Sequence, residues 1–271
     1  MTEAASLTVE EVQGRLETRQ LGYPLVLLDH VDSTNDTAKA LARRGAAHGT
    51  VVVAESQGSG RGRLGRSWHS PPGLNLHVSV VIRPSLPIER VSLLTLVAAV
   101  ALACALEEQG IESEIRWPND VMVEGRKLAG VLTELDTMGD GGPVVILGIG
   151  INCNAGPGDF PPELADVATS LAQVLGGDVD RAVVLAAVLN SLEPLLDRVA
   201  AEGGLPAVLA EWEARWRDLG AQVSAAVPGG EAVRGTAVGL AEDGALLIDT
   251  GAAEPVRVMA GDVRSAQEEG A

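Results

Sequence analysis

The chain has 271 residues, a formal net charge of −17 at pH 7, 46% hydrophobic residues and only 2% aromatic residues. Its length suffices for one large core, or for a core with one small module. The negative charge opposes nonspecific binding to DNA and to acidic membranes, and the two cysteines, Cys104 and Cys153, are too few for a disulfide framework and lack zinc-ligand spacing.

Short helices and strands alternate through the first third of the chain. Residues 1–21 are polar and acidic and lack the pattern of a signal peptide. The predicted elements are a short helix within 6–20, a strand at 24–28, a helix at 37–44 behind the capping residues 32–35, and strands at 50–54 and 74–82. A polar loop with three arginines, residues 58–72, separates the last two strands.

The most apolar segment of the chain is the run at 91–106. It is interrupted by two hydroxyl residues and is shorter than the roughly 20 residues that span a bilayer. We therefore predict a buried helix at 91–109 and a cytoplasmic protein. Cys104 and Cys153 both have apolar neighbours, so we predict that each is a small core residue.

The remainder of the chain divides into three segments with different sequence patterns. The first is a group of predicted strands at 115–117, 121–123, 128–135 and 144–151, and the second is a helical pattern at 181–216 that breaks near 203–204. The third segment begins after Gly220 and has the pattern of short strands between Gly and Asp turns over about 50 residues. We predict a main domain at 1–220 and a small β-domain at 221–271.

The loop at 60–65 matches the pattern G-x-G-x-x-G and follows a predicted strand. Dinucleotide binding through this pattern needs a helix that begins there, and two prolines at 71–72 disfavour one. Arg61, Arg63 and Arg66 favour another interpretation, because guanidinium groups bind carboxylates and phosphates in bidentate fashion. The glycines let the backbone approach a ligand closely, so the loop predicts a small anionic ligand, against the alternative of a solvated loop.

Two further segments combine polar side chains with turn or cap positions. The segments 116–120 and 126–130 form either a plain hairpin, or a site that places Asp120 near metal-bound phosphates and Lys127 near a reacting carboxylate. The segment Asp32-Ser33-Thr34-Asn35 forms either an ordinary helix N-cap or a set of groups that hydrogen-bond a neutral ligand such as a cyclic urea. The residues alone leave both alternatives open.

Taken in order, these segments resemble the biotin protein ligase family. The matching pieces are Asp32 to Asn35, Gln57, Gly60 to Trp68, Arg116 to Val121, Arg126 to Gly130, and Gly148 to Asn152. Each piece is modestly specific, but all of them in this order and spacing are highly specific. The tail, with Gly235-Thr236-Ala237 and Asp243-Gly244, resembles the family's small C-terminal β-domain. Arg116 departs from the family, which often has Lys there, and we leave it out of the catalytic set.

The resemblance implies roles for twelve residues. The biotin head group would lie at Ser33, Thr34, Asn35 and Gln57, and the loop that closes over biotin and the adenylate would contribute Arg61, Gly62 and Arg63. The nucleotide would lie at Arg66, Trp68, Asn119 and Asp120, with Asp120 also reaching Mg²⁺ through the phosphates. Lys127 would contact the biotin carboxylate and the α-phosphate. Lys127 and Arg63 would be the catalytic residues.

The fold that the resemblance implies is α+β. A mixed β-sheet catalytic domain of the biotin/lipoate ligase type, packed with helices, would bind biotin and ATP at 1–220, and a small SH3-like β-barrel would follow at 221–271. The implied activity is ATP- and Mg²⁺-dependent, AMP-forming transfer of biotin to a lysine of the biotin carboxyl carrier domain of an acyl-CoA carboxylase, without a tightly bound cofactor.

Two alternatives remain from the sequence. One is a lipoate or octanoate protein ligase or transferase, although the loop at 60–68 favours biotin. The other is a biotin-sensing transcriptional repressor. About 31 residues precede the first motif, which is short for the winged helix of such repressors, so we expect the ligase-only type with neither DNA nor membrane as a partner.

Overall fold

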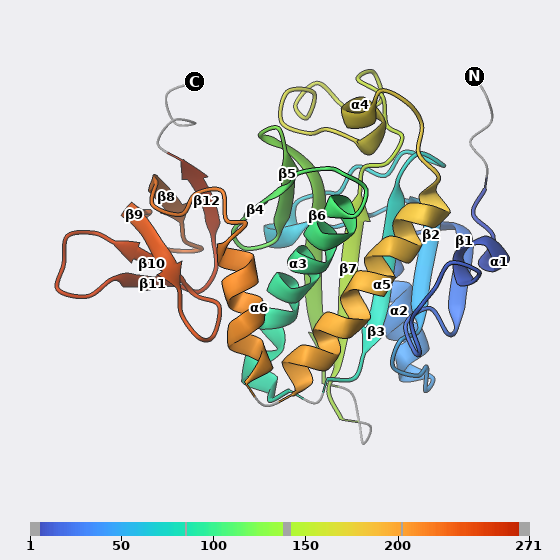
Figure 1. Cartoon of the computed structure of the whole chain (residues 1–271), viewed down its shortest axis with the longest axis horizontal. Coiled ribbons are helices and arrows are strands. Elements are labelled where there is room, and N and C mark those ends of the chain that lie inside the picture. Colours follow the sequence, from blue (N-terminus) through green and yellow to red (C-terminus); the bar gives the residue numbers. More distant parts are fainter. Residues whose placement is uncertain (1–5, 85, 138–141, 202, 266–271) are drawn as a thin grey trace.

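A seven-stranded mixed sheet forms the centre of the protein (Figure 1). The computed structural model describes residues 6–84, 86–137, 142–201 and 203–265. The sheet has the order β1-β2-β3-β7-β6-β5-β4, and β1 and β2 pair in parallel while all other neighbours are antiparallel. The strands are β1 (Leu25–Val31), β2 (Val51–Gln57), β3 (Leu76–Ile82), β4 (Glu114–Arg116), β5 (Asp120–Val123), β6 (Arg126–Asp136) and β7 (Val144–Ile151). The predicted mixed sheet is confirmed.

Helices cover both faces of this sheet. On one side of the sheet α3 contacts β4, β5 and β6, and α5 and α6 pack against α3 and against each other; the other face packs against α2 (Figure 1). The helical elements are α1 (Val9–Gln13), α2 (Thr34–Arg43), the short 3-10 helices η1 (Arg63–Gly65) and η2 (Ile88–Leu93), α3 (Leu94–Glu107), α4 (Leu171–Leu175), α5 (Arg181–Ala200) and α6 (Gly204–Glu213). On its own face of the sheet, α2 covers β2, β3 and β7, and its first residues line a cavity over the neighbouring part of that face.

The predicted buried helix at 91–109 is α3, and it lies at the centre of the core. The segment Arg90–Glu107 has the length and the hydropathy of a membrane span, but 72% of it is buried inside the fold. Apolar side chains surround α3 on nearly all sides, since it packs between the sheet and the helices α5 and α6. Its hydropathy is therefore explained by burial in a protein core.

A second sheet of five antiparallel strands follows α6. Its order is β11-β10-β9-β8-β12, and the strands are β8 (Gln222–Ala226), β9 (Val233–Leu240), β10 (Leu246–Asp249), β11 (Val256–Val258) and β12 (Asp262–Ser265). This arrangement confirms the predicted small C-terminal β-fold and is compatible with an SH3-like topology. Within the described residues, no pairing joins β11 to β12 into a closed barrel.

The small sheet packs against the main body of the protein through specific contacts. The indole Nε1 of Trp117 donates to the carbonyl of Gly244 at 3.1 Å, and the backbone N–H of Leu240 donates to Glu213 Oε1 at 2.7 Å. In Figure 1 the small sheet lies beside β4, the edge strand of the large sheet, and β12 is its strand on that side. The division of the chain at residue 220 into two separately folding domains stays a prediction.

Candidate active site

A cavity of about 400 Å³ lies on the face of the large sheet that carries α2, next to the start of that helix. Its volume falls in the range that binds small-molecule ligands, roughly 300–1,000 Å³. Strands β3, β5, β6 and β7 form its floor, and the loop at 58–68, the start of α2 and strand β12 form its walls. The cavity is lined by all twelve residues for which the resemblance implies a role: Ser33, Thr34, Asn35, Gln57, Arg61, Gly62, Arg63, Arg66, Trp68, Asn119, Asp120 and Lys127.

The start of α2 supplies a rigid set of polar groups to one end of the cavity. Gln57 Oε1 accepts from the backbone N–H of Thr34 at 2.9 Å and from its hydroxyl at 3.1 Å. The hydroxyl of Ser79 donates to Asn35 Oδ1 at 2.6 Å and lies 2.8 Å from Thr34 Oγ1. Ser33 is the N-cap of α2, but its hydroxyl makes no capping bond. These buried groups are therefore held in fixed orientations at the wall of the cavity.

The Gly-rich loop, residues 58–68, folds back on itself beside this end of the cavity. Gly62 N–H donates to the carbonyl of Arg66 at 2.7 Å, and Trp68 N–H donates to the carbonyl of Gly60 at 2.8 Å. A Cβ at Gly60 would lie only 2.8 Å from the carbonyl oxygen of Trp68, so this turn requires glycine. The loop contains only the three-residue turn η1 and opens no α-helix, which excludes the dinucleotide-binding interpretation of its glycine pattern.

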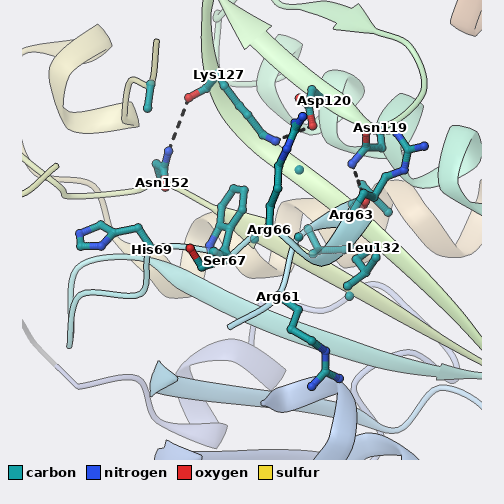
Figure 2. A pocket seen from close by; sticks show the side chains of 18 of the residues that line it. Arg61, Arg63, Arg66, Ser67, His69, Asn119, Asp120, Lys127, Leu132 and Asn152 are labelled. Atoms are coloured by element: carbon teal, nitrogen blue, oxygen red, sulfur yellow. Dashed lines mark hydrogen bonds and ion pairs between the residues drawn. The ribbon is translucent and has the colours of Figure 1, made fainter. Parts of the chain in front are cut away.

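The three arginines of the loop point to different partners (Figure 2). Arg63 Nη1 donates to Asn119 Oδ1 at 3.2 Å and to the carbonyl of Gly261 at 3.4 Å, and burial lowers the pKa of Arg63. Arg66 forms an ion pair with Asp262 of β12. Arg61 turns away from both and binds Asp36 on α2. The loop is thus attached to the small sheet on one side and to α2 on the other.

Lys127, at the start of β6, projects into the cavity opposite this loop. Its ammonium lies 2.6 Å from Asp120 Oδ1 and 5.3 Å from the ring centre of Trp68, a cation–π distance. Trp68 itself rests on the backbone of β7, where a Cβ at Gly150 would lie 2.4 Å from its ring. Gly150 therefore makes room for the indole, and the indole in turn positions the lysine.

The cavity combines a neutral polar end with a cationic end. The neutral end carries hydroxyl and amide groups from α2 and Gln57, and the cationic end carries Arg63, Arg66 and Lys127. Arg116 also lines the cavity, and its Nε lies 3.8 Å from Asp218. Such a cavity suits a ligand that is neutral and polar at one end and anionic at the other.

Comparisons with known proteins agree with this geometry. The model of the biotin/lipoate A/B protein ligase family matches residues 27–152, and that of the biotin protein ligase C terminal domain matches residues 218–264. The bifunctional ligase/repressor BirA of Bacillus subtilis is 40% identical over 245 residues, which cover 90% of this chain and 75% of that protein. The chain belongs to the biotin protein ligase family.

Two more members of the family extend the comparison. The biotin–[acetyl-CoA-carboxylase] ligase of Mycobacterium tuberculosis is 33% identical, over 87% of this chain and 88% of that protein. The biotin protein ligase from Aquifex aeolicus, solved in complex with biotin and ATP, superposes with a TM-score of 0.78 at 34% identity and covers 89% of this chain and 99% of that one. The likeness thus includes both sheets of the family fold.

Two features of this ligase-family cavity were missed by the sequence analysis. Asp262 and Arg264 of β12 line it, although no site residue was predicted after residue 220. His77 lies on β3 in its floor, 1% exposed. Neither ring nitrogen of His77 has a hydrogen-bond partner within the described part of the chain. A single histidine between apolar residues of a strand gives no signal in the sequence that separates a cavity position from a core position.

We expect His77 to make the fold sensitive to mild acid. Burial lowers the pKa of His77 to about 4, whereas a histidine in an unfolded chain titrates near 6.5. Between these values the unfolded chain binds a proton that the folded protein does not, so the free energy of unfolding falls as the pH decreases from 6.5 to 4. At pH 5 we expect His77 to have removed on the order of 2 kcal/mol relative to pH 8.

Urea denaturation at pH 8 and at pH 5 tests this expectation. His77→Gln should reduce the difference between the two pH values, while His30→Gln, which changes an exposed histidine, should keep it. Part of the difference should persist in His77→Gln because burial also lowers the pKa of His48. An equal loss of stability in wild type and His77→Gln would show that His77 is not the titrating group.

Proposed function

We propose that the protein is a biotin protein ligase that activates biotin with ATP to biotinyl-5′-AMP and transfers the biotin to one lysine of a biotin carboxyl carrier domain. The observation that carries the proposal is the cavity with a neutral polar end and a cationic end. Biotin has a cyclic urea at one end and a carboxylate at the other, so its two ends match those of the cavity. The biotin- and ATP-bound relative from Aquifex aeolicus supports the same assignment.

We place the urea ring of biotin against Ser33, Thr34, Asn35 and Gln57. The hydroxyls and the carboxamides can both donate and accept, as a urea oxygen and its two N–H groups require. Because Thr34 already bonds to both Gln57 and Ser79, these groups need little reordering when the ligand enters. The biotin carboxylate then lies toward Lys127, with Arg61, Gly62 and Arg63 of the loop over the ligand.

The first half-reaction brings two anions together. The carboxylate oxygen of biotin attacks the α-phosphorus of ATP, the bond to pyrophosphate breaks, and pyrophosphate leaves with the electron pair. We assign to Lys127 and Arg63 the stabilisation of the negative charge that develops on the α-phosphoryl oxygens. Arg66, Trp68, Asn119 and Asp120 hold the nucleotide side of the cavity in this proposal.

The carboxylates of the cavity suit a magnesium ion that is carried by the nucleotide. The described residues contain no cluster of three or more metal-ligating His, Cys, Asp or Glu side chains, and Asp120 is one carboxylate at the cationic end. One or two carboxylates together with substrate phosphates are a usual Mg²⁺ environment. We propose that Asp120 approaches Mg²⁺ through the phosphates, where the ion would neutralise charge on the phosphate oxygens.

The second half-reaction needs the adenylate to be kept from water. Biotinyl-5′-AMP is a mixed anhydride, and the loop at 58–68 over the cavity would exclude water from it. The amine of the carrier lysine attacks the acyl carbon, AMP leaves, and the amine loses its proton as the amide forms. No covalent enzyme intermediate is required, and burial raises the pKa of both thiols, that of Cys153 to about 12.

A lipoate or octanoate ligase is the nearest alternative, since the family model that matches residues 27–152 includes lipoate ligases by its description. The protein should be incubated with ATP, Mg²⁺ and either biotin, lipoate or octanoate, and the acyl-AMP identified by mass. We expect biotinyl-AMP alone. Formation of lipoyl-AMP or octanoyl-AMP at a comparable rate, or the absence of any acyl-AMP, would contradict the proposal.

A repressor function is the second candidate because the relative from Bacillus subtilis is named a bifunctional ligase/repressor. Our proposal of a ligase without DNA as a partner predicts no gel shift of the protein's own upstream DNA, with or without biotin and ATP. A biotin-dependent shift would indicate that the protein binds DNA and acts as a repressor in addition to its ligase function. We also propose a cytoplasmic location without a membrane partner, which fractionation of the source cells would test.

A further inference from the structure

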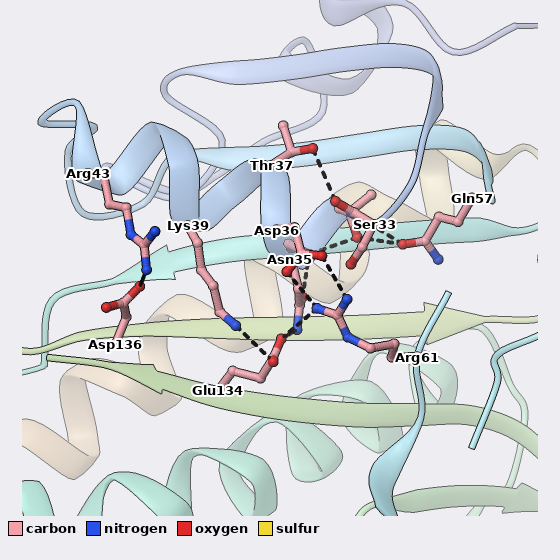
Figure 3. A network of polar contacts seen from close by, with 12 residues as sticks. Ser33, Asn35, Asp36, Thr37, Lys39, Arg43, Gln57, Arg61, Glu134 and Asp136 are labelled. Carbon is pink, nitrogen blue, oxygen red and sulfur yellow. Dashed lines mark hydrogen bonds and ion pairs between the residues drawn. The ribbon is translucent and has the colours of Figure 1, made fainter. Parts of the chain in front are cut away.

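An ion pair at the rim of the cavity joins the Gly-rich loop to helix α2. Asp36, in the first turn of α2, accepts from Arg61 through both carboxylate oxygens, at 2.6 and 2.7 Å (Figure 3). This bidentate geometry is the strongest form of an arginine–carboxylate contact, and the hydrogen bond from Arg61 lowers the pKa of Asp36. Arg61 lines the cavity but Asp36 does not, so Asp36 can act on the ligand site only through the loop.

A second carboxylate stands behind this pair. Glu134 on β6 lies 3.6 Å from Arg61 Nη2, and it accepts from Asn35 Nδ2 at 2.5 Å and from Lys39 Nζ at 2.8 Å (Figure 3). The charge of Glu134 is therefore already shared with Lys39, and Asp36 is the main partner of Arg61. The guanidinium of Arg61 lies between Asp36 of α2 and Glu134 of β6, so both of these elements restrain its position.

The backbone of the loop transmits this restraint to Arg63. Only Gly62 separates the two arginines, and the loop closes through the bonds Gly62 N–H to Arg66 and Trp68 N–H to Gly60. Fixing the backbone of a free residue costs conformational entropy, and a loop that is ordered in advance does not incur this cost when the ligand binds. A contact that holds Arg61 therefore also keeps Arg63 near Asn119.

We propose that Asp36 is a positioning residue that holds the Gly-rich loop closed through Arg61 before biotin and ATP bind. The proposal rests on the proposed ligase function for its kinetic consequences, but not for its structural ones. Asp36 contacts neither the cavity nor the reacting atoms, so its loss changes the order of the loop and leaves the chemistry of Lys127 in place. The expected effect is on ligand binding rather than on the rate of the chemical step.

The variant Asp36→Asn tests the proposal, and Asp136→Asn is its matched control. Asp136 on β6 accepts from Arg43 of α2 at 3.0 Å, so the control also removes one carboxylate from an ion pair on α2 but leaves the loop untouched. In the ligand-free protein, amide hydrogen exchange of residues 58–68 should become faster in Asp36→Asn and stay unchanged in Asp136→Asn. Addition of 1 M salt to the wild type should also speed exchange in this loop, because salt screens an exposed ion pair.

Kinetics provide a second readout. We expect Asp36→Asn to raise the KM for biotin about fivefold, which corresponds to about 1 kcal/mol, with kcat for biotinyl-AMP formation nearly unchanged, and Asp36→Glu to recover part of the loss. Unchanged loop exchange in both Asp36→Asn and Arg61→Gln, or a fall in kcat at constant KM, would overturn the proposal. If the wild type forms no biotinyl-AMP, the ligase function fails, whereas the exchange experiment still decides whether Asp36 holds the loop.

Discussion

Replacing Lys127 with Ala is expected to slow the formation of biotinyl-AMP by a factor on the order of 10²–10³ while the protein stays folded. The ammonium is the one that faces Asp120 and Trp68 inside the cavity, 2.6 Å from the carboxylate of Asp120. Its removal takes away a positive charge from the place where we assign the attacking carboxylate and the α-phosphate. It also leaves Asp120 without this partner, so a carboxylate would then repel the anionic ligands.

Pyrophosphate release in the presence of biotin and ATP measures this effect. Arg198→Ala is the matched control, because Arg198 forms an exposed ion pair with Glu211 at 2.7 Å between α5 and α6, away from the cavity. The control removes one positive charge from the chain and should release pyrophosphate at the wild-type rate. Near-normal release by Lys127→Ala, with an unchanged melting temperature, would remove Lys127 from the mechanism.

Arg63→Gly is expected to release the intermediate into solution. The change removes the contacts of Arg63 with Asn119 and Gly261 and adds backbone freedom at the centre of the loop. The change also removes the hydrogen bond that we assign between Arg63 and the phosphate of the adenylate. A hydrogen bond to a charged group contributes about 1.5–3 kcal/mol, so we expect biotinyl-AMP to dissociate faster by a factor on the order of 10 to 100. The freed acyl-adenylate is reactive, so lysines of bystander proteins should become biotinylated.

The assay compares wild type and Arg63→Gly, each with biotin, ATP, Mg²⁺ and serum albumin, on a streptavidin blot. The chain has two lysines, Lys39 and Lys127, and both are in ion pairs, so labelling of the enzyme itself competes little with labelling of albumin. We expect labelled albumin with the variant only. If the variant still forms the adenylate and albumin stays as clean as with wild type, Arg63 does not retain the intermediate.

The elements that the sequence predicted well are those with a strong local pattern. The long, mostly apolar run of α3 and the β-branched strands β2 and β7 each specify their own conformation, and the structure confirms them. Local signals were weaker at the ends of elements. The predicted helix at 37–44 starts three residues earlier, at Thr34, because Ser33 is its N-cap, and the helix predicted within 6–20 ends at Gln13, where Gly14 is its C-cap.

The parts of the site that could not be predicted depend on long-range pairing. Strand β12 is four residues long and has three polar residues, and only its pairing with β8 makes it a strand. Its Asp262 reaches Arg66 from 196 residues away in the chain. The contact of Arg61 with Asp36 has the same origin, because the folding of the loop, and not the sequence around either residue, brings the two charges together.

Transfer of biotin to a purified carrier domain tests the central claim most directly. The protein should be mixed with biotin, ATP, Mg²⁺ and the carrier domain of an acyl-CoA carboxylase from the same organism, and the carrier analysed by intact mass and by peptide mapping. We predict the mass increase of one biotin on a single lysine, dependent on both ATP and biotin and lost in Lys127→Ala. The proposed function would be contradicted if this protein left the carrier unmodified while a control ligase of known activity, in a separate reaction, modified the same carrier.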